Sequence, residues 1–353
     1  KTVPRSTVYL SSSVVIQNAL MLSSISTFST TVPFFALVLC GFVAARRGVL
    51  PLAAIGGMNA FVLFFALPCM LFRFGANTPL AQLFDPNVAI TYALCGMVIV
   101  ALVIAITRRD RMGWNDASFG ALVGAFPNSG FMGIPLMVAL MGSQAAGTVM
   151  VTIMVDMVIT TSLCIALSRL DGHSAASAIH AAKNALRGVL ANPLPWAIFG
   201  GAAVTAFQLA LPQPLLKTIG LMAGAASPVA LFTIGAVLAR PTPDSHQGSG
   251  HWMEILPVAA IKLFLHPLLV GLAGMAAIRM GVPLDTFTLK VLVLTAALPS
   301  ASNVSLLAER FGADNGRVAR IILVSTTAAF FSFAGIVGIV GIVGIVDTVE
   351  LKA

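Results

Sequence analysis

Two clusters of small polar residues lie beside prolines inside long apolar stretches of the sequence. The first is Pro-Asn-Ser-Gly at residues 127–130, and the second is Pro-Ser-Ala-Ser-Asn at residues 299–303. Proline lacks a backbone donor and clashes with the preceding helical turn, so each cluster predicts a break in a helix. Broken backbone at membrane depth is tolerated only inside protein or along a cavity. The clusters therefore predict an internal polar site where two broken helices meet.

Such a site suits a carboxylate. The N-terminal ends of half-helices carry partial positive charge and free N–H groups, and the asparagine and serine side chains add donors and acceptors. Glycine tolerates the unusual dihedral angles of a break, and a proline fits the start of a new half-helix. The expected ligands are Asn128, Ser129, Gly130, Ser300, Ser302 and Asn303, and the expected break positions are Pro127, Pro135 and Pro299.

Three ionisable residues lie within apolar stretches, where such groups are costly and usually face a cavity or a partner. We expect Asp156 to bind a proton or a coupling ion, with His266 as a second candidate. Lys262 lies one helical turn before His266, on the same face, and would attract a bound anion. The alternatives are a purely structural Asp–Lys pair, and a histidine that bonds a carbonyl freed by Pro267.

The composition excludes a soluble domain. Hydrophobic residues make up 58% of the 353 residues and charged residues only 9%, against about 25% charged residues in soluble chains. The net charge of +8 does not indicate nucleic-acid binding, because the basic residues lie between apolar stretches and form no patch interleaved with aromatics. They suit anionic lipid head groups and a fixed topology in the lipid bilayer. The four cysteines lie within apolar stretches without metal-ligand spacing, so no metal site or disulfide framework is expected.

Ten segments are long and apolar enough to predict an all-α polytopic membrane protein. They are residues 30–46, 55–74, 88–107, 117–142, 146–168, 192–211, 216–239, 252–279, 286–311 and 318–345. The expected organisation is an N-terminal extension (1–29), a first five-helix repeat (30–168), a cytoplasmic linker (169–191), a second five-helix repeat (192–346) and a C-terminal tail (347–353).

An internal repeat supports two related halves. The pattern P-x-x-L-F-x-apolar-G at residues 68–75 returns 160 residues later at 228–235, and the same offset carries Gly41 onto Gly201. With the first segment entering from outside, twelve Lys and Arg residues fall inside and seven outside, so both termini are predicted outside. Five helices per half then require the second half to be inverted, with helices 4 and 9 as broken crossover helices.

The chain contains no phosphate-binding loop, no H-E-x-x-H and no G-x-S-x-G motif. An enzyme is therefore not expected, no cofactor is expected, and ATP is not the evident energy source. A doubled membrane protein with one broken helix in each half is typical of a secondary transporter.

The motif P-N-S-G-F-M-G-I-P at residues 127–135 resembles the fourth-helix motif of the auxin efflux carrier family. Residues 298–303 and 307–312 resemble that family's second crossover helix, and residues 59–68 its second helix. Within the family, residues 65–79 and 156–158 look most like bacterial malonate carriers. The resemblance covers roughly residues 30–335.

This resemblance implies X-shaped crossovers, a scaffold domain from helices 1, 2, 6 and 7, a transport domain from the rest, and an elevator-type motion. It implies a small carboxylate substrate, malonate being the first expectation, in a multi-pass protein of the bacterial inner (plasma) membrane. A homodimer through the scaffold helices and coupling to H⁺ or Na⁺ are compatible with it. The alternatives are a carrier for malate or an auxin-like indole acid, and an anion channel or membrane sensor.

Overall fold

The computed structural model describes residues 31–108, 112–170, 192–239 and 251–350. Helices make up nearly all of this part of the chain, as the sequence predicts. The first half contains the helix Thr31–Arg46, α2 (Ala54–Phe61), η1 (Val62–Ala66), α3 (Leu67–Gly75), α4 (Leu80–Leu83), α5 (Pro86–Thr107), α6 (Trp114–Ala125), η3 (Ser129–Gly133), α7 (Ile134–Met141), α8 (Ala145–Val155), η4 (Asp156–Thr160) and α9 (Thr161–Leu167).

The second half contains α11 (Pro193–Ala206), α12 (Gln213–Leu238), α13 (His251–Ala260), η5 (Ile261–Leu265), α14 (His266–Arg279), α15 (Thr286–Ala296), α16 (Asn303–Arg310) and α17 (Asn315–Glu350). The elements labelled η are π-helical turns, which carry an extra residue and are frequent at functional sites. Three of them, η1, η4 and η5, lie inside otherwise continuous helices.

Each of the ten predicted apolar segments contains helix. In the described residues, six helices are long and apolar enough to cross a membrane: Ala54–Gly75, Leu80–Thr107, Ala145–Leu167, Gln213–Leu238, Trp252–Arg279 and Asn315–Gly341. Four shorter apolar helices accompany them: Thr31–Arg46, Ser129–Met141, Pro193–Ala206 and Thr286–Ala296. The predicted extension 1–29 and nearly all of the linker 169–191 lie outside the described residues, whereas α17 continues through most of the predicted tail.

Local sequence explains where several helices begin. The Asp85 side chain accepts hydrogen bonds from the first free amides of α5, and Pro86 occupies the first turn. Asn192 does the same for α11, and Asp285 caps α15. These residues satisfy amides that a helix start leaves without partners, at a gain of about 1 kcal/mol each.

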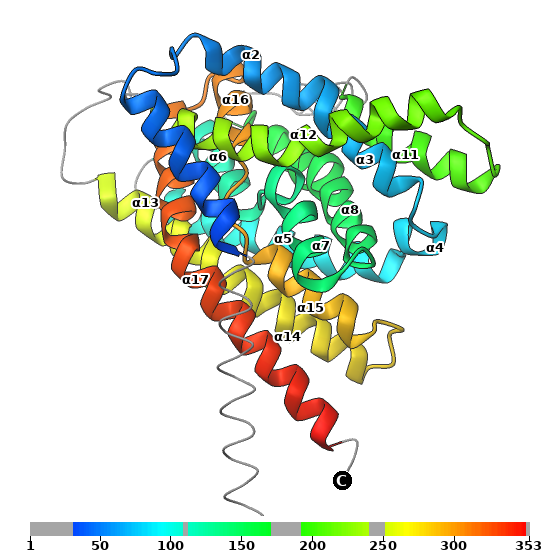
Figure 1. The fold of residues 1–353 in the computed structure, drawn as a ribbon. Coiled ribbons are helices and arrows are strands. Elements are labelled where there is room, and N and C mark those ends of the chain that lie inside the picture. The colour runs from blue at the N-terminus through cyan, green and yellow to red at the C-terminus, as the bar shows by residue number, and fades with distance from the viewer. Residues whose placement is uncertain (1–30, 109–111, 171–191, 240–250, 351–353) are drawn as a thin grey trace, which may run out of the picture.

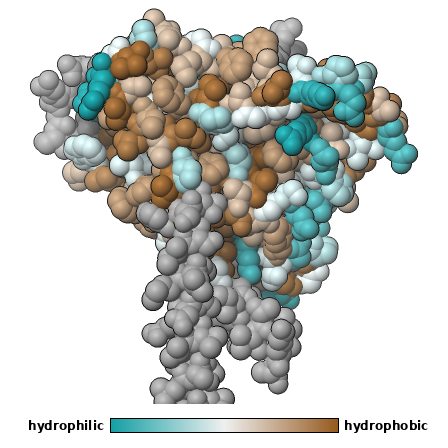
Figure 2. All heavy atoms as spheres, in the orientation of Figure 1, coloured by the Kyte–Doolittle hydropathy of each residue, from teal (hydrophilic) through white to brown (hydrophobic). Residues whose placement is uncertain are grey.

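The helices form two groups. In Figure 1, α2, α3, α11 and α12 lie together along the upper side, where α3 packs against both α11 and α12. Below them, α5 packs against α6, α8 and α14, while α14 packs against α15 and α13 against α17. Hydrophobic side chains cover much of the outer face in Figure 2, and Leu39, Phe64, Leu221 and Met253 are among the exposed ones. Such a surface suits lipid tails.

Two close helix crossings join the upper group. A Cβ atom on Gly235 of α12 would overlap the carbonyl of Val38 in the helix Thr31–Arg46. A Cβ atom on Gly201 of α11 would overlap the carbonyl of Phe72 in α3, next to Gly75. Small residues let helix backbones approach this closely in membranes. The two crossings correspond, because Gly75 and Gly235 are equivalent in the 160-residue repeat.

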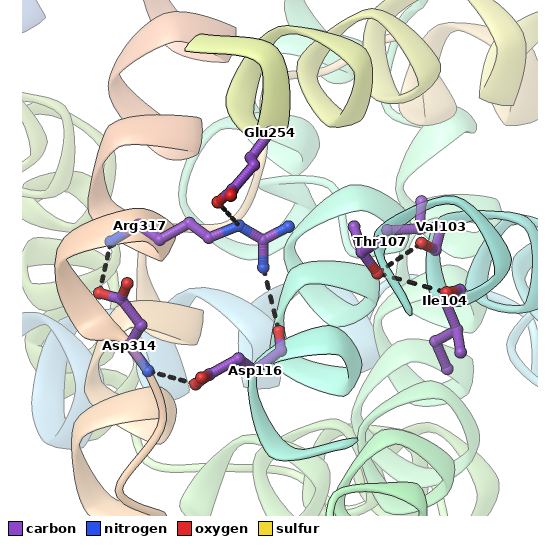
Figure 3. Close-up of polar contacts among 7 residues, drawn as sticks. All are labelled: Val103, Ile104, Thr107, Asp116, Glu254, Asp314 and Arg317. Atoms are coloured by element: carbon purple, nitrogen blue, oxygen red, sulfur yellow. Dashed lines mark hydrogen bonds and ion pairs between the residues drawn. The ribbon is translucent and has the colours of Figure 1, made fainter. Parts of the chain in front are cut away.

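A buried arginine joins three helices of the lower group (Figure 3). Arg317 of α17 is 2% exposed, and its Nη1 donates to the backbone oxygen of Asp116 at 3.1 Å. Its Nε lies 3.8 Å from Oε2 of Glu254 in α13. The backbone N–H of Asp314 donates to Oδ1 of Asp116 at 2.7 Å. This arginine link therefore ties the start of α17 to the starts of α6 and α13.

Replacing Gly235 by alanine should lower the thermal unfolding midpoint of the detergent-solubilised protein. The added methyl group meets backbone rather than a side chain that can move, so a loss of about 1–3 kcal/mol is expected. Gly220→Ala is the matched control on α12, because nothing lies within 4 Å of a Cβ at that position. Equal unfolding midpoints for the two variants would show that α12 and the helix Thr31–Arg46 do not pack in close contact at Gly235.

Replacing Arg317 by methionine should destabilise the protein by up to about 3–5 kcal/mol, because it leaves neighbouring carboxylates without their cation. Arg279→Met, at the exposed end of α14, is the control. The measurement is the midpoint of thermal unfolding by size-exclusion chromatography. If Arg317→Met is as stable as the control, the arginine link does not contribute to the stability of the fold.

Candidate functional site

The first break follows α6. Phe126 makes the last helical bond, from its N–H to the carbonyl of Leu122, and Pro127 has no N–H to continue the ladder. The helix resumes at Ser129 with η3, where the carbonyl of Asn128 accepts bonds from Met132 and Gly133 at 3.1 and 3.0 Å. The carbonyl of Phe126 and the N–H of Asn128 are therefore free to pair outside their own helices. Pro135 lies in the first turn of α7.

The second break follows α15, which ends at Ala296. Pro299 again removes a donor, and the N–H of Ser300 bonds the hydroxyl of Ser325 on α17 at 3.2 Å instead of a helical carbonyl. Helix α16 then begins at Asn303, after Ser302. Residues 297–302 are therefore free of helical structure.

The two breaks pair with each other. The N–H of Asn128 donates to the carbonyl of Pro299 at 2.8 Å, and the N–H of Ala301 donates to the carbonyl of Phe126 at 2.9 Å. Pro127 and Ser300 thus form an isolated antiparallel bridge between segments that are far apart in the sequence. We call residues 126–128 and 299–301 the crossing. Its mutual bonds satisfy polar backbone groups that would otherwise be stranded in an apolar interior.

A small cavity, open to solvent at its mouth, lies beside the crossing. Asn128, Gly130 and Asn303 contribute to its wall. The Asn303 Oδ1 atom is buried and has no hydrogen-bond partner among the residues that the structure describes. The remaining wall is formed by Phe126, Pro127, Phe131 and Ala301 around the crossing, by Ile153 and Met157, and by Leu63, Leu67 and Leu194.

The other predicted ligands lie near the crossing without lining this cavity. The hydroxyl of Ser129 is buried and donates to the carbonyl of Pro127 at 3.4 Å. Ser300 is fully buried and belongs to the bridge itself. Ser302 precedes α16 without capping it through its side chain. The structure thus brings Asn128, Gly130 and Asn303 together at a cavity whose wall does not include the three serines.

Asp156 lies at the start of η4 and is 1% exposed. Its Oδ2 accepts a hydrogen bond from the hydroxyl of Tyr92 at 3.0 Å, and its Oδ1 accepts one from Thr160 at 3.2 Å. Its neighbour Met157 reaches the wall of the cavity. A buried carboxylate held by two neutral hydroxyls can take up and release a proton with little rearrangement.

Lys262 and His266 lie close to Asp156 and not at the cavity. Lys262 lies in η5, is fully buried and interacts electrostatically with Asp156. Its Nζ donates to the carbonyl of Ala296 at 2.6 Å and lies 3.3 Å from Nδ1 of His266. The His266 ring lies 5.8 Å from the Tyr92 ring, centroid to centroid. We call Tyr92, Asp156, Lys262 and His266 the buried charge cluster.

Sequence reasoning missed Tyr92. The chain contains 22 phenylalanines and only two tyrosines, so a tyrosine within the apolar segment 88–107 is a signal that could have found it. A buried phenol usually has a hydrogen-bond partner. Thr160 carried no comparable signal, because threonine is common in membrane helices and bonds its own helix.

No group of three or more His, Cys, Asp or Glu side chains that could hold a metal ion occurs among the described residues. The four cysteines are free thiols. The side chains at the crossing and at the buried charge cluster can form hydrogen bonds, attract opposite charge and transfer protons.

Comparisons with known proteins point to one family of membrane transporters. The family model described as a membrane transport protein matches residues 26–337. A protein of Rhizobium meliloti (strain 1021) named "Putative malonate transporter" is 30% identical over 298 residues, which cover 83% of this chain and 89% of that protein.

More distant relatives share most of their length with this chain. The "Uncharacterized transporter YfdV" of Escherichia coli (strain K12) is 25% identical over 290 residues, 79% of this chain and 86% of that protein. "Auxin efflux carrier component 8" of Arabidopsis thaliana is 23% identical over 325 residues, 77% of this chain and 85% of that protein. These matches support an integral membrane protein with a transport role that is not enzymatic. The chain belongs to the membrane transport protein family, the auxin efflux carrier family that its sequence motifs resemble.

Proposed function

We propose that this protein is a secondary active transporter that moves a small organic anion, malonate first among the candidates, across the bacterial inner membrane. The crossing carries this proposal. Two broken helices from different halves of the chain pair at one point, and a cavity with two asparagine side chains opens beside them. The name of the Rhizobium meliloti relative supports malonate as the substrate.

The carboxylate would bind between Asn128 and Asn303. Both residues line the cavity, and Asn303 is the first residue of α16, at the positive end of that helix's dipole. An amide N–H from each asparagine would replace water around one carboxylate. The apolar wall formed by Leu63, Leu67 and Phe131 suits the methylene of a small diacid and also tolerates a larger acid such as an indole acid.

The proposed architecture is two inverted repeats of five helices each, residues 30–168 and 192–346, with α6–α7 and α15–α16 as the crossover helices. Two observations support it. The contact of Gly235 with Val38 corresponds to the contact of Gly75 with Ile198 under the 160-residue repeat, and the two breaks pair antiparallel to each other. An inverted repeat with broken helices places the substrate near the middle of the bilayer, with both termini outside in this topology.

The cavity lies where the proposed scaffold and transport domains meet. Leu67 and Leu194 belong to α3 and α11 of the upper helix group, whereas Asn128 and Asn303 belong to the crossover helices. A substrate at this boundary would move with the crossing while the upper group stays fixed, as an elevator-type motion requires. Asp156, with His266 beside it in the buried charge cluster, is the proposed site of H⁺ or Na⁺ coupling.

Asn128→Ala and Asn303→Ala should each raise the KM for malonate uptake into proteoliposomes by about 10- to 150-fold. This range is the loss of one hydrogen bond to a charged group, about 1.5–3 kcal/mol. Asn77→Ala, in an exposed loop, is the control. Uptake at the parental rate by both well-folded variants would contradict the site. If malate or indole-3-acetate binds the protein and malonate does not, the substrate is one of those acids instead.

Asp156→Asn should abolish acceleration of malonate uptake by an imposed pH or sodium gradient, while exchange of internal for external malonate persists. The amide keeps the shape and hydrogen bonds of the protonated carboxyl but cannot ionise. Glu309→Gln, which changes an exposed carboxyl, is the control. Full gradient dependence in the asparagine variant would exclude Asp156 as the coupling group.

A further inference from the structure

We propose that Lys262 is a positioning residue, which fastens the end of α15 beside the crossing and links that end to the charge state of Asp156. This role differs from direct attraction of the substrate anion. The proposal rests on the proposed function only in treating the crossing as the substrate site, and its first test does not involve substrate.

The break after α15 leaves the carbonyl of Ala296 without a helical partner. The carbonyl of Ala296 would normally accept from the N–H of Ser300, four residues on, but that N–H bonds Ser325. The Nζ of Lys262 donates to the Ala296 carbonyl instead, at 2.6 Å. A cation at a helix C-terminus also meets the negative end of the helix dipole. Lys262 thus satisfies the last carbonyl of the half-helix, three residues before Pro299 of the crossing.

The hydrogen atoms of Lys262 decide the tautomer of its neighbour. When Lys262 is an ammonium group, which has only donors, Nδ1 of His266, 3.3 Å away, accepts from it. His266 is then neutral and carries its proton on Nε2, which is buried without a partner among the described residues. The buried charge cluster then combines one basic amine, Lys262, with one titratable carboxyl, Asp156.

Titratable side chains from three neighbouring helices also face Lys262 and Asp156. Tyr92 and Cys95 lie on α5, Cys164 on α9 and His266 on α14. The contribution of α15 is the backbone carbonyl of Ala296. Of these neighbours, Asp156 is the one carboxyl, and phenol and thiol groups stay protonated near neutral pH.

The consequence is a direct link between ion loading and the crossing. When Asp156 binds a proton, Lys262 loses its counter-charge in an environment where an uncompensated ammonium is costly. The ammonium group is then stabilised by its bonds to Ala296 and His266 alone, or these bonds rearrange. Lys262 is fully buried and already bonded to these two groups, so it is poorly placed to meet a substrate in the cavity.

The test is hydrogen–deuterium exchange of the full-length protein without substrate, followed by mass spectrometry. Lys262→Met should speed exchange of the amides in residues 297–303 at least ten-fold, because α15 loses its terminal partner. Lys262→Arg should restore much of the protection. Lys290→Met, a half-buried lysine on α15 itself, should leave exchange at 297–303 unchanged. Unchanged exchange in Lys262→Met would overturn the proposal.

If Lys262→Met does not fold, the double variant Asp156→Asn/Lys262→Met takes its place. Its exchange is then compared with that of Asp156→Asn alone. This pair removes both charges together, and faster exchange at 297–303 is again the expected result. Equal exchange in the two proteins overturns the proposal.

A second readout separates positioning from simple structural support. In the proteoliposome assay, Lys262→Met should displace the pH profile of malonate uptake, because Asp156 loses the positive charge beside it. A profile of unchanged shape at a lower rate would show a structural role only and overturn the link to Asp156. If the asparagine variants leave uptake intact while exchange responds to Lys262, the substrate site fails and the lysine's role stands.

Discussion

Satisfaction of backbone hydrogen bonds at the crossing is the constraint on which the rest of this structure depends. Pro127 and Pro299 each interrupt a helix in an apolar interior, where a stranded N–H or carbonyl group costs several kcal/mol. Each break supplies partners to the other, through the bonds from Asn128 to Pro299 and from Ala301 to Phe126. The two halves of the chain are therefore held in one register at the proposed substrate site.

Other contacts keep the crossing in place. The close glycine contacts pack the upper helices against one another, and the arginine link joins the starts of α6, α13 and α17. Lys262 bonds the end of α15, and Ser325 of α17 bonds the amide of Ser300. The π-helical turns η4 and η5 hold Asp156 and Lys262 within continuous helices, so the charged groups lie at the interior without further breaks.

Much of this arrangement follows from the sequence, and the remainder depends on tertiary contacts. Proline and glycine inside apolar segments predict the breaks because their backbone chemistry is local, and the repeated glycines predict corresponding positions. Sequence could not predict which groups pair across the crossing, since those bonds join residues that are 171 and 175 positions apart in the chain. It also associated Lys262 with the substrate, whereas the structure places its ammonium on Ala296, a carbonyl that is free only because Ser300 turns to Ser325.

The most direct test of the central claim is amide exchange of the wild-type protein with and without saturating malonate. If the crossing is the substrate site, malonate should slow exchange in two separate segments, residues 126–130 and 299–303, with the same concentration dependence. Acetate at equal concentration should have little effect. Saturable malonate binding that protects other segments and leaves both breaks unchanged would contradict the account.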